Sequence, residues 1–236
     1  MAKAQIAVVR FPGSNCDLDA IHALRTMGSV KADLVWHEDP TLGKRDAIVL
    51  PGGFSFGDYL RGGAIAAKSP ALERVRSFAE SGRPVLGICN GFQVLTEAGL
   101  LPGALLRNSS LRFVCRWVNV RVERTDTPFT RNLRKGDVLK IPIAHNEGRF
   151  FAQKDDLARI AEDRQAVFRY CDVNGRRTKE ANPTGTTDDI AGVSNKDGNV
   201  LGLMPHPERA SEPVLSPDGS ADGMRLFASL VESLSC

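Results

Sequence analysis

Short apolar runs alternate along the chain with segments in which apolar residues recur every three or four positions. The runs predict buried strands at residues 6–9, 32–36, 47–50, 85–88 and 200–204. The helical spacing is found at Leu18, Ile21, Leu24 and Met27, at Leu72, Val75 and Phe78, and at Met224, Phe227, Leu230, Val231 and Leu234. Alternation of these two patterns is typical of a mainly parallel sheet flanked by helices. The sequence therefore predicts an α/β fold.

The middle of the chain has a different pattern. Residues 111–143 carry β-branched runs separated by turn signals, which predicts antiparallel hairpins added to the parallel sheet. Residues 174–189 are polar and contain Gly, Pro and Thr, which predicts an exposed loop.

Composition limits the classes of protein to consider. The 236 residues are 42% hydrophobic and 25% charged, which suits one large globular domain spanning residues 1–236. The net charge of +3 argues against a dedicated nucleic-acid binder. No apolar run is long enough to span a bilayer, and the N-terminal residues show no signal-peptide pattern. The five cysteines are scattered without a C-x-x-C pair, so we expect reduced thiols in a cytoplasmic protein and no metal site.

Cys89 lies in the most informative motif of the chain. Residues 87–91 read Gly-Ile-Cys-Asn-Gly, a G-x-C-x-G placed between a predicted strand and a helix from about residue 91 to 98. This is the thiol form of the nucleophile elbow, in which flanking glycines remove steric clashes at a strained turn. The turn places the sulfur near a helix N-terminus, where the thiolate is favoured. The other interpretation is a buried structural cysteine between packing glycines.

Cys16 also precedes a predicted helix and competes with Cys89. It lacks the glycine-flanked elbow, and the like charge of Asp17 and Asp19 is expected to oppose a thiolate there. Cys16 therefore ranks below Cys89 as a nucleophile.

A cysteine nucleophile needs a base and a group that orients the base. Of the four histidines, His22 and His37 have no evident partner, whereas the other two each begin a His-x-Glu: His145 with Glu147, and His206 with Glu208. Both pairs follow predicted strands, and the prolines around His206 favour a rigid base without deciding the choice.

These residues resemble the motifs of a known family. The G-x-C-x-G-x-Q at Cys89, followed far downstream by His206 and Glu208, is similar to the catalytic triad of class I glutamine amidotransferases. Longer segments resemble, in order, the family of small, separate glutaminase subunits of phosphoribosylformylglycinamidine synthase: residues 11–17, 52–61, 87–93, 144–148 and 204–209. The resemblance implies that Cys89, His206 and Glu208 form the triad, which decides between the two histidines.

The rest of the expected site follows from the same motifs. The oxyanion is expected to be stabilised by the backbone N–H of Asn90, the residue after the nucleophile, and by the loop at Gly52 and Gly53, where glycine allows close backbone approach at the end of the strand 47–50. The same loop lacks both phosphate-binding glycine patterns, so we do not expect it to bind phosphate. By resemblance Gln93 contacts the glutamine substrate. The stretch 108–113 is expected to bind the α-amino and carboxylate ends of the substrate, with the residues Asn108, Ser110 and Phe113. His145 and Glu147 are placed near a partner or the ammonia exit.

The function that the resemblance implies is hydrolysis of L-glutamine, with ammonia supplied to formylglycinamide ribonucleotide in de novo purine biosynthesis. It implies a large ATP-using synthetase partner, a small bridging subunit, and no cofactor in this chain, because ATP and magnesium are expected in the partner. The alternatives are a glutaminase serving another synthetase, a free-standing cysteine hydrolase, and an inactive regulatory module.

Between residues 107 and 140 there are nine Lys or Arg and three Asp or Glu, which predicts a solvated face or, alternatively, a docking surface for an acidic synthetase.

Overall fold

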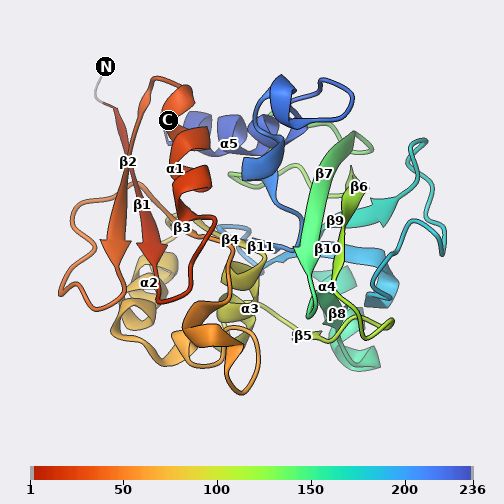
Figure 1. Ribbon diagram of the computed structural model, residues 1–236, viewed down its shortest axis with the longest axis horizontal. Coiled ribbons are helices and arrows are strands. Elements are labelled where there is room, and N and C mark those ends of the chain that lie inside the picture. The colour runs from red at the N-terminus through yellow and green to blue at the C-terminus, as the bar shows by residue number, and fades with distance from the viewer. Residues whose placement is uncertain (1–2, 235–236) are drawn as a thin grey trace.

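The computed structural model describes residues 3–234, so Cys236 lies outside the described residues. A nine-stranded sheet runs through the molecule in the order β2-β1-β3-β4-β11-β10-β9-β6-β7 (Figure 1). Its first half comprises β2 (Val30–Trp36), β1 (Ala4–Arg10), β3 (Ala47–Leu50), β4 (Val85–Ile88) and β11 (Val200–Leu203), which pair in parallel. The parallel strands β3, β4 and β11 are buried along their whole length, which explains their continuous apolar runs. The predicted parallel core is confirmed.

The second half of the sheet is antiparallel. It contains β10 (Ile190–Ser194), β9 (Ala166–Cys171), β6 (Val114–Val122) and β7 (Val138–His145). The β6–β7 pairing, from Val114 opposite His145 to Arg121 opposite Val138, confirms that the middle of the chain adds an antiparallel hairpin. The apolar pattern does not predict β9 and β10, which connect this hairpin to the parallel strands. A separate two-stranded sheet pairs β5 (Ala104–Leu106) with β8 (Arg149–Phe151).

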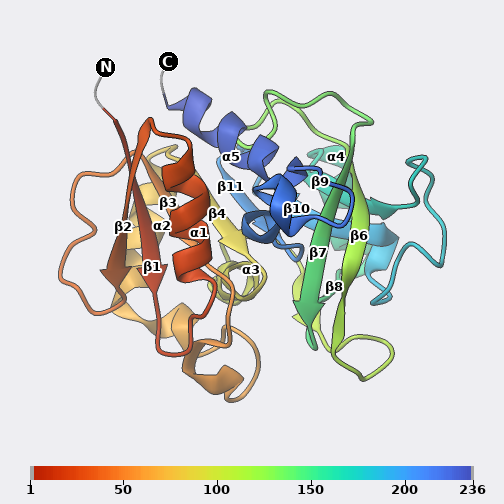
Figure 2. The same cartoon turned by 45° about the horizontal axis from the view of Figure 1, so that its top comes forward.

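Helices cover both faces of the parallel half. The helices α1 (Asp17–Thr26) and α5 (Asp222–Ser233) contact each other on one face, and α2 (Pro70–Glu80) and α3 (Asn90–Glu97) lie on the other (Figures 1 and 2). The helix α4 (Lys154–Glu162), which the pattern did not predict, precedes β9. Short 3-10 turns complete the chain at Ser55–Asp58, Ala66–Lys68, Thr187–Asp189, Pro207–Ala210 and Pro213–Leu215. The layers are those of an α/β fold, as predicted.

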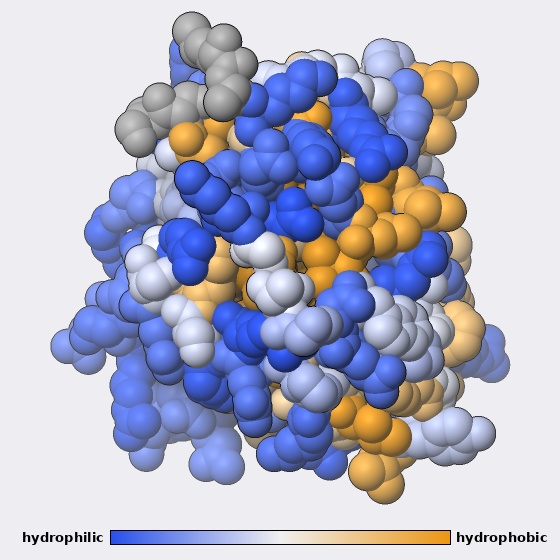
Figure 3. All heavy atoms as spheres, turned by 90° about the vertical axis from the view of Figure 1, so that its left-hand side faces the viewer, coloured by the Kyte–Doolittle hydropathy of each residue, from blue (hydrophilic) through white to orange (hydrophobic). Residues whose placement is uncertain are grey.

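The edge of the sheet at β2 carries Lys31 and Asp33, and such charges discourage edge-to-edge pairing with another sheet. The surface on this side is largely hydrophilic, with apolar residues gathered in limited patches (Figure 3). Within residues 3–234 no helix combines the length and hydrophobicity needed to cross a membrane. The loop at 174–189 has the predicted irregular structure, although Thr184 and Thr186 in it are buried.

Candidate active site

The candidate site lies where neighbouring parallel strands end. Cys16, Gly52 and His206 come soon after β1, β3 and β11, and Cys89 comes directly after β4. Because the carboxyl ends of parallel strands share one edge of the sheet, residues far apart in sequence meet there. A cavity of about 450 Å³ opens at this edge, and Cys89 and His206 both line it.

Cys89 has the backbone of a strained elbow. Its φ of 50° and ψ of −102° lie outside the usual regions for a non-glycine residue. A Cβ on Gly87 would lie 2.5 Å from Cδ1 of Leu95, and a Cβ on Gly91 would lie 2.0 Å from the carbonyl oxygen of Leu50. Neither contact is sterically possible, so the predicted reason for a glycine on each side is confirmed.

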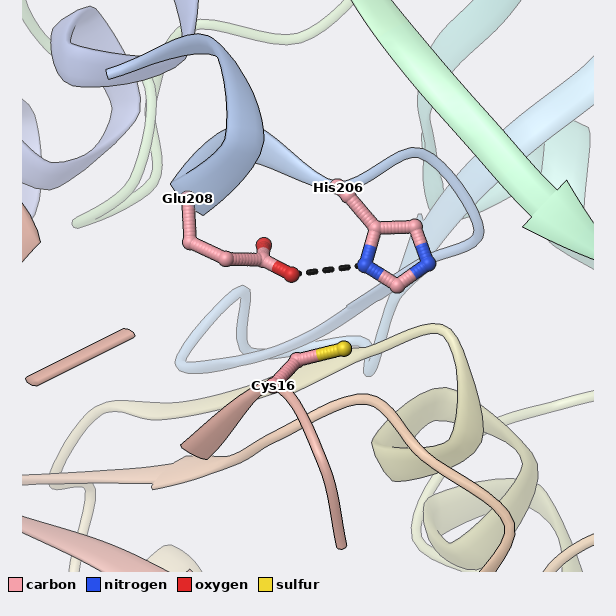
Figure 4. A group of neighbouring side chains, drawn as sticks. All are labelled: Cys16, His206 and Glu208. Carbon is pink, nitrogen blue, oxygen red and sulfur yellow. Dashed lines mark hydrogen bonds and ion pairs between the residues drawn. The ribbon is translucent and has the colours of Figure 1, made fainter. Parts of the chain in front are cut away.

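The His206 side chain is oriented by Glu208. The Nδ1 atom of His206 lies 2.6 Å from Oε1 of Glu208, and both side chains are buried (Figure 4). Because a carboxylate accepts hydrogen bonds, Nδ1 carries the proton and donates it, which directs the lone pair of Nε2 away from Glu208. Among the described residues Nε2 makes no hydrogen bond and is buried. It is therefore available to a reacting group.

The electrostatics of His206 suit proton transfer. Burial acts to lower its pKa, but the charge of Glu208 and interactions with Cys89 and Cys16 outweigh burial and raise the pKa of His206 well above its usual value. A histidine that attracts a proton strongly can take the proton of the Cys89 thiol. The other pair, His145 and Glu147, has the opposite character. Burial, and then the charge of His206, lower the pKa of His145 to about 3.

Cys16 enters the site, which the sequence reasoning missed. Its sulfur lies beside the His206 and Glu208 pair (Figure 4), and one ligand atom from each of the three residues lies within 4.8 Å of the others. The sulfur also lies 2.9 Å from a guanidinium nitrogen of Arg209. That positive charge opposes a metal ion at this group. Asp17, next to Cys16 in the sequence, forms an ion pair with Arg10.

The glycines at 52 and 53 are required by close packing. A Cβ on Gly52 would lie 2.7 Å from Cε1 of His206, and a Cβ on Gly53 would lie 2.7 Å from the carbonyl oxygen of Gly13. Gly53 has a φ of +148° and lines the cavity. The structure thus brings Gly52 against His206 and Gly53 into the cavity wall, and the oxyanion role of this loop stays a prediction.

Asn90 and Gln93 hold the loops around the cavity. The Nδ2 atom of Asn90 donates to Oε1 of Gln93 at 2.9 Å and to Oδ1 of Asp58 at 3.2 Å. The Nε2 atom of Gln93 donates to the backbone oxygen of Glu147 at 2.6 Å. Gln93 lines the cavity as expected, but much of its carboxamide is already hydrogen-bonded to the protein.

The three residues expected from the 108–113 stretch have different positions. Phe113 lines the cavity, whereas Asn108 and Ser110 do not. Asn108 is fully buried and joins two loops: its Nδ2 atom donates to the backbone oxygens of Arg112 and His145, and its Oδ1 atom accepts from the N–H of Gly148. Asn108 therefore holds the cavity wall together from behind.

The sheet topology and the elbow at Cys89 are those of a glutamine amidotransferase fold. The family model described as "CobB/CobQ-like glutamine amidotransferase domain" matches residues 3–232, and the chain belongs to this family.

Its relatives narrow the class further. The chain is 54% identical over 228 residues to "Phosphoribosylformylglycinamidine synthase subunit PurQ" of Methanosarcina acetivorans, covering 97% of each chain. It is 55% identical to the subunit of the same name from Thermus thermophilus, covering 97% of this chain and 98% of the relative. Among solved structures, "Structure of PurLQS from Thermotoga maritima" matches with a TM-score of 0.85 and 44% identity, covering 98% and 99% of the two chains. The resemblance to these glutaminase subunits is confirmed.

Proposed function

We propose that this chain is the glutaminase subunit of phosphoribosylformylglycinamidine synthase, releasing ammonia from L-glutamine for purine biosynthesis. One observation supports the chemistry. Cys89, at a strained elbow, shares a cavity with the buried His206, whose Nδ1 atom is hydrogen-bonded to Glu208. The identity of the subunit is supported by relatives of more than 50% identity over nearly the whole chain.

The first step is attack on the side-chain amide. His206 Nε2 takes the proton of the Cys89 thiol, and the thiolate sulfur forms a bond to the amide carbon of glutamine. Glu208 holds the Nδ1 proton and stabilises the imidazolium that results. His206 then gives its Nε2 proton to the nitrogen, the carbon–nitrogen bond breaks, and ammonia leaves behind a γ-glutamyl thioester on Cys89.

The oxyanion formed in this step needs hydrogen-bond donors. We assign them to the backbone N–H of Asn90, next to the nucleophile, and to the loop at Gly52 and Gly53. Each well-placed donor is worth roughly 3 kcal/mol of barrier. The absence of side chains at 52 and 53 lets the backbone approach the reacting carbon. Water then hydrolyses the thioester, with His206 as the base, and releases glutamate.

The partners belong to the same proposal. The likeness to a chain of the PurLQS structure supports assembly with a large synthetase subunit and a small bridging subunit. The ATP and magnesium of the synthesis are assigned to the synthetase. Within the basic stretch, Arg121, Arg124 and Lys140 form ion pairs with acids of the chain itself, which favours a solvated face over a free positive docking surface.

One experiment separates this function from the alternatives. Glutamate release is measured for the chain alone and with the ATP-dependent synthetase subunit, using the wild type and Cys89→Ala. We expect activity that depends on Cys89 and rises with the synthetase. Activity that survives Cys89→Ala would reject the mechanism, and activity indifferent to the synthetase would favour a free-standing hydrolase.

A further inference from the structure

Two carboxylates face the cavity beside Cys89. Asp58 lies in the 3-10 turn after β3, Glu147 follows β7, and both line the cavity together with Cys89 and Gln93. Asp58 accepts a hydrogen bond from Asn90 at 3.2 Å and, within residues 3–234, has no ion-pair partner. Its carboxylate is thus held against the nucleophile elbow without a compensating positive charge.

The two acids repel each other across the cavity. Burial of Asp58, and then the charge of Glu147, raise the pKa of Asp58 to about 6. Glu147 is held in place, because its Oε2 atom accepts from the N–H of Gly62 at 3.1 Å and its backbone oxygen accepts from Gln93. A bound cation would relieve this repulsion. Carboxylates lose hydration when they are buried, and the charge of a bound cation compensates for that loss.

A third acceptor in the same cavity wall has no partner. His145 is buried with 4% of its surface exposed, and it lines the cavity. The Nδ1 atom of His145 lies 3.2 Å from the Oδ1 atom of Asn108. This Oδ1 atom already accepts a hydrogen bond from the N–H of Gly148, and the Nδ2 atom of Asn108 donates to two backbone oxygens. Nδ1 of His145 must therefore be the donor, so Nε2 is a lone-pair acceptor. Within the described part of the chain Nε2 makes no hydrogen bond.

A positive side chain completes the arrangement on the open side. The Nε atom of Arg107 lies 3.5 Å from Oε1 of Glu147, and Arg107 also lines the cavity. Its side chain is 70% exposed, so it can move to a second anion at little cost. The cavity therefore offers acceptors and negative charge next to the guanidinium of Arg107, which matches the two ends of an amino-acid zwitterion. The second guanidinium in the cavity lining, that of Arg209, lies beside Cys16.

We propose that Asp58 and Glu147, with Nε2 of His145, bind the α-ammonium group of the substrate L-glutamine, and that Arg107 binds its α-carboxylate. This inference rests on the proposed function and names the groups that recognise the substrate. An ammonium group has three N–H donors to satisfy, and charge-assisted hydrogen bonds to carboxylates are the strong ones. The subsite replaces the 108–113 stretch as the receptor for the amino-acid end, because Asn108 has its polar atoms occupied in the wall.

The test compares two substrates in the assembled synthetase complex. L-Glutamine is compared with glutaramate, which has the same side-chain amide and carboxylate but no α-amino group. The variants are Asp58→Asn and Glu147→Gln, with Asp155→Asn on the exposed face of α4 as the matched control. Asparagine suits position 58, because the φ of 52° there is a conformation that Asn tolerates and its side-chain oxygen can still accept from Asn90.

The proposal predicts a loss specific to glutamine. Sites built to pair a substrate N–H reject the analogue that lacks it by roughly 10⁴-fold, so the wild type should strongly prefer glutamine. In Asp58→Asn, kcat/KM for glutamine should fall by roughly 50-fold or more through KM, while kcat/KM for glutaramate stays within about threefold, since one charged partner of the ammonium is removed. Equal losses on both substrates, or unchanged use of glutamine, would overturn the subsite.

A binding measurement keeps this result separate from failure of the proposed chemistry. In complexes carrying Cys89→Ala, calorimetric titration with L-glutamine measures binding without turnover. Adding Asp58→Asn should remove most of that affinity, and adding Asp155→Asn should leave it unchanged. Retained affinity in the Asp58→Asn complex overturns the subsite, whereas hydrolysis by the wild type that does not require Cys89 overturns the proposed function instead.

Discussion

A single methyl group at position 52 should disable the base while leaving the fold intact. The Cβ of Gly52→Ala would lie 2.7 Å from Cε1 of His206 and 3.1 Å from Sγ of Cys16. Carbon atoms in contact stay at least ~3.5 Å apart, so the imidazole has to move by roughly 0.8 Å. That ring is held by the 2.6 Å hydrogen bond to Glu208, and moving it takes Nε2 away from Cys89. Since misplacement by about 1 Å can cost 10²-fold in rate, we expect kcat to fall by roughly 10- to 100-fold.

The assay is glutamate release by the assembled complex across a range of glutamine concentrations. KM should change by less than about threefold, because uniform binding of the substrate does not involve the base. Gly28→Ala is the control: position 28 has a φ of +72° and nothing within 4 Å of its Cβ. It should lose about 1 kcal/mol of stability without any change in kcat. A Gly52→Ala enzyme with kcat within twofold of wild type would refute the proposed contact between this loop and the base.

Three further outcomes follow from the site. Glu208→Gln should lower kcat/KM by roughly 10²- to 10⁴-fold. It should also move the alkaline limb of the pH profile to lower pH, because the charge of Glu208 helps to raise the pKa of His206 and the imidazolium persists only below that pKa. Asn108→Ala should reduce the free energy of unfolding in urea by roughly 2–4 kcal/mol, because buried partners lose their hydrogen bonds; an unchanged midpoint would contradict its role in the wall. The KM for glutamine should rise as the pH falls through about 6, because Asp58 becomes neutral, and Asp58→Asn should abolish this pH dependence.

The local sequence pattern was sufficient to predict the parallel strands of the core and the elbow at Cys89. Continuous apolar runs identify strands buried on both faces, and the glycines around Cys89 are required by contacts within one strand–turn–helix unit. The strands β9 and β10 were not identified. β9 contains Arg169 and β10 contains Gly192, which interrupt an apolar run, and both segments are strands because of the neighbours with which they pair.

The composition of the cavity wall depends on contacts between distant segments. Cys16 and Arg209 are 193 residues apart in sequence, and Asn108 and His145 are 37 apart. Nothing near Cys16 in sequence indicates that a guanidinium lies beside its sulfur. Likewise, the local sequence around Asp58 gives no sign of the carboxylate of Glu147. The choice of His206 over His145 also depended on family resemblance, and the structure now gives a physical reason: Nδ1 of His206 is held by a carboxylate, whereas Nδ1 of His145 is held by a neutral amide.

The most direct test of the account is to find which thiol the substrate modifies, because Cys16 and Cys89 line the same cavity. The complex is treated with 6-diazo-5-oxo-L-norleucine, an electrophilic analogue of glutamine, and the labelled peptide is identified by mass spectrometry in the wild type, Cys89→Ala and Cys16→Ala. We expect a stoichiometric label on Cys89, absent in Cys89→Ala and present in Cys16→Ala. A label on Cys16 in the wild type, with glutaminase activity lost only in Cys16→Ala, would contradict it.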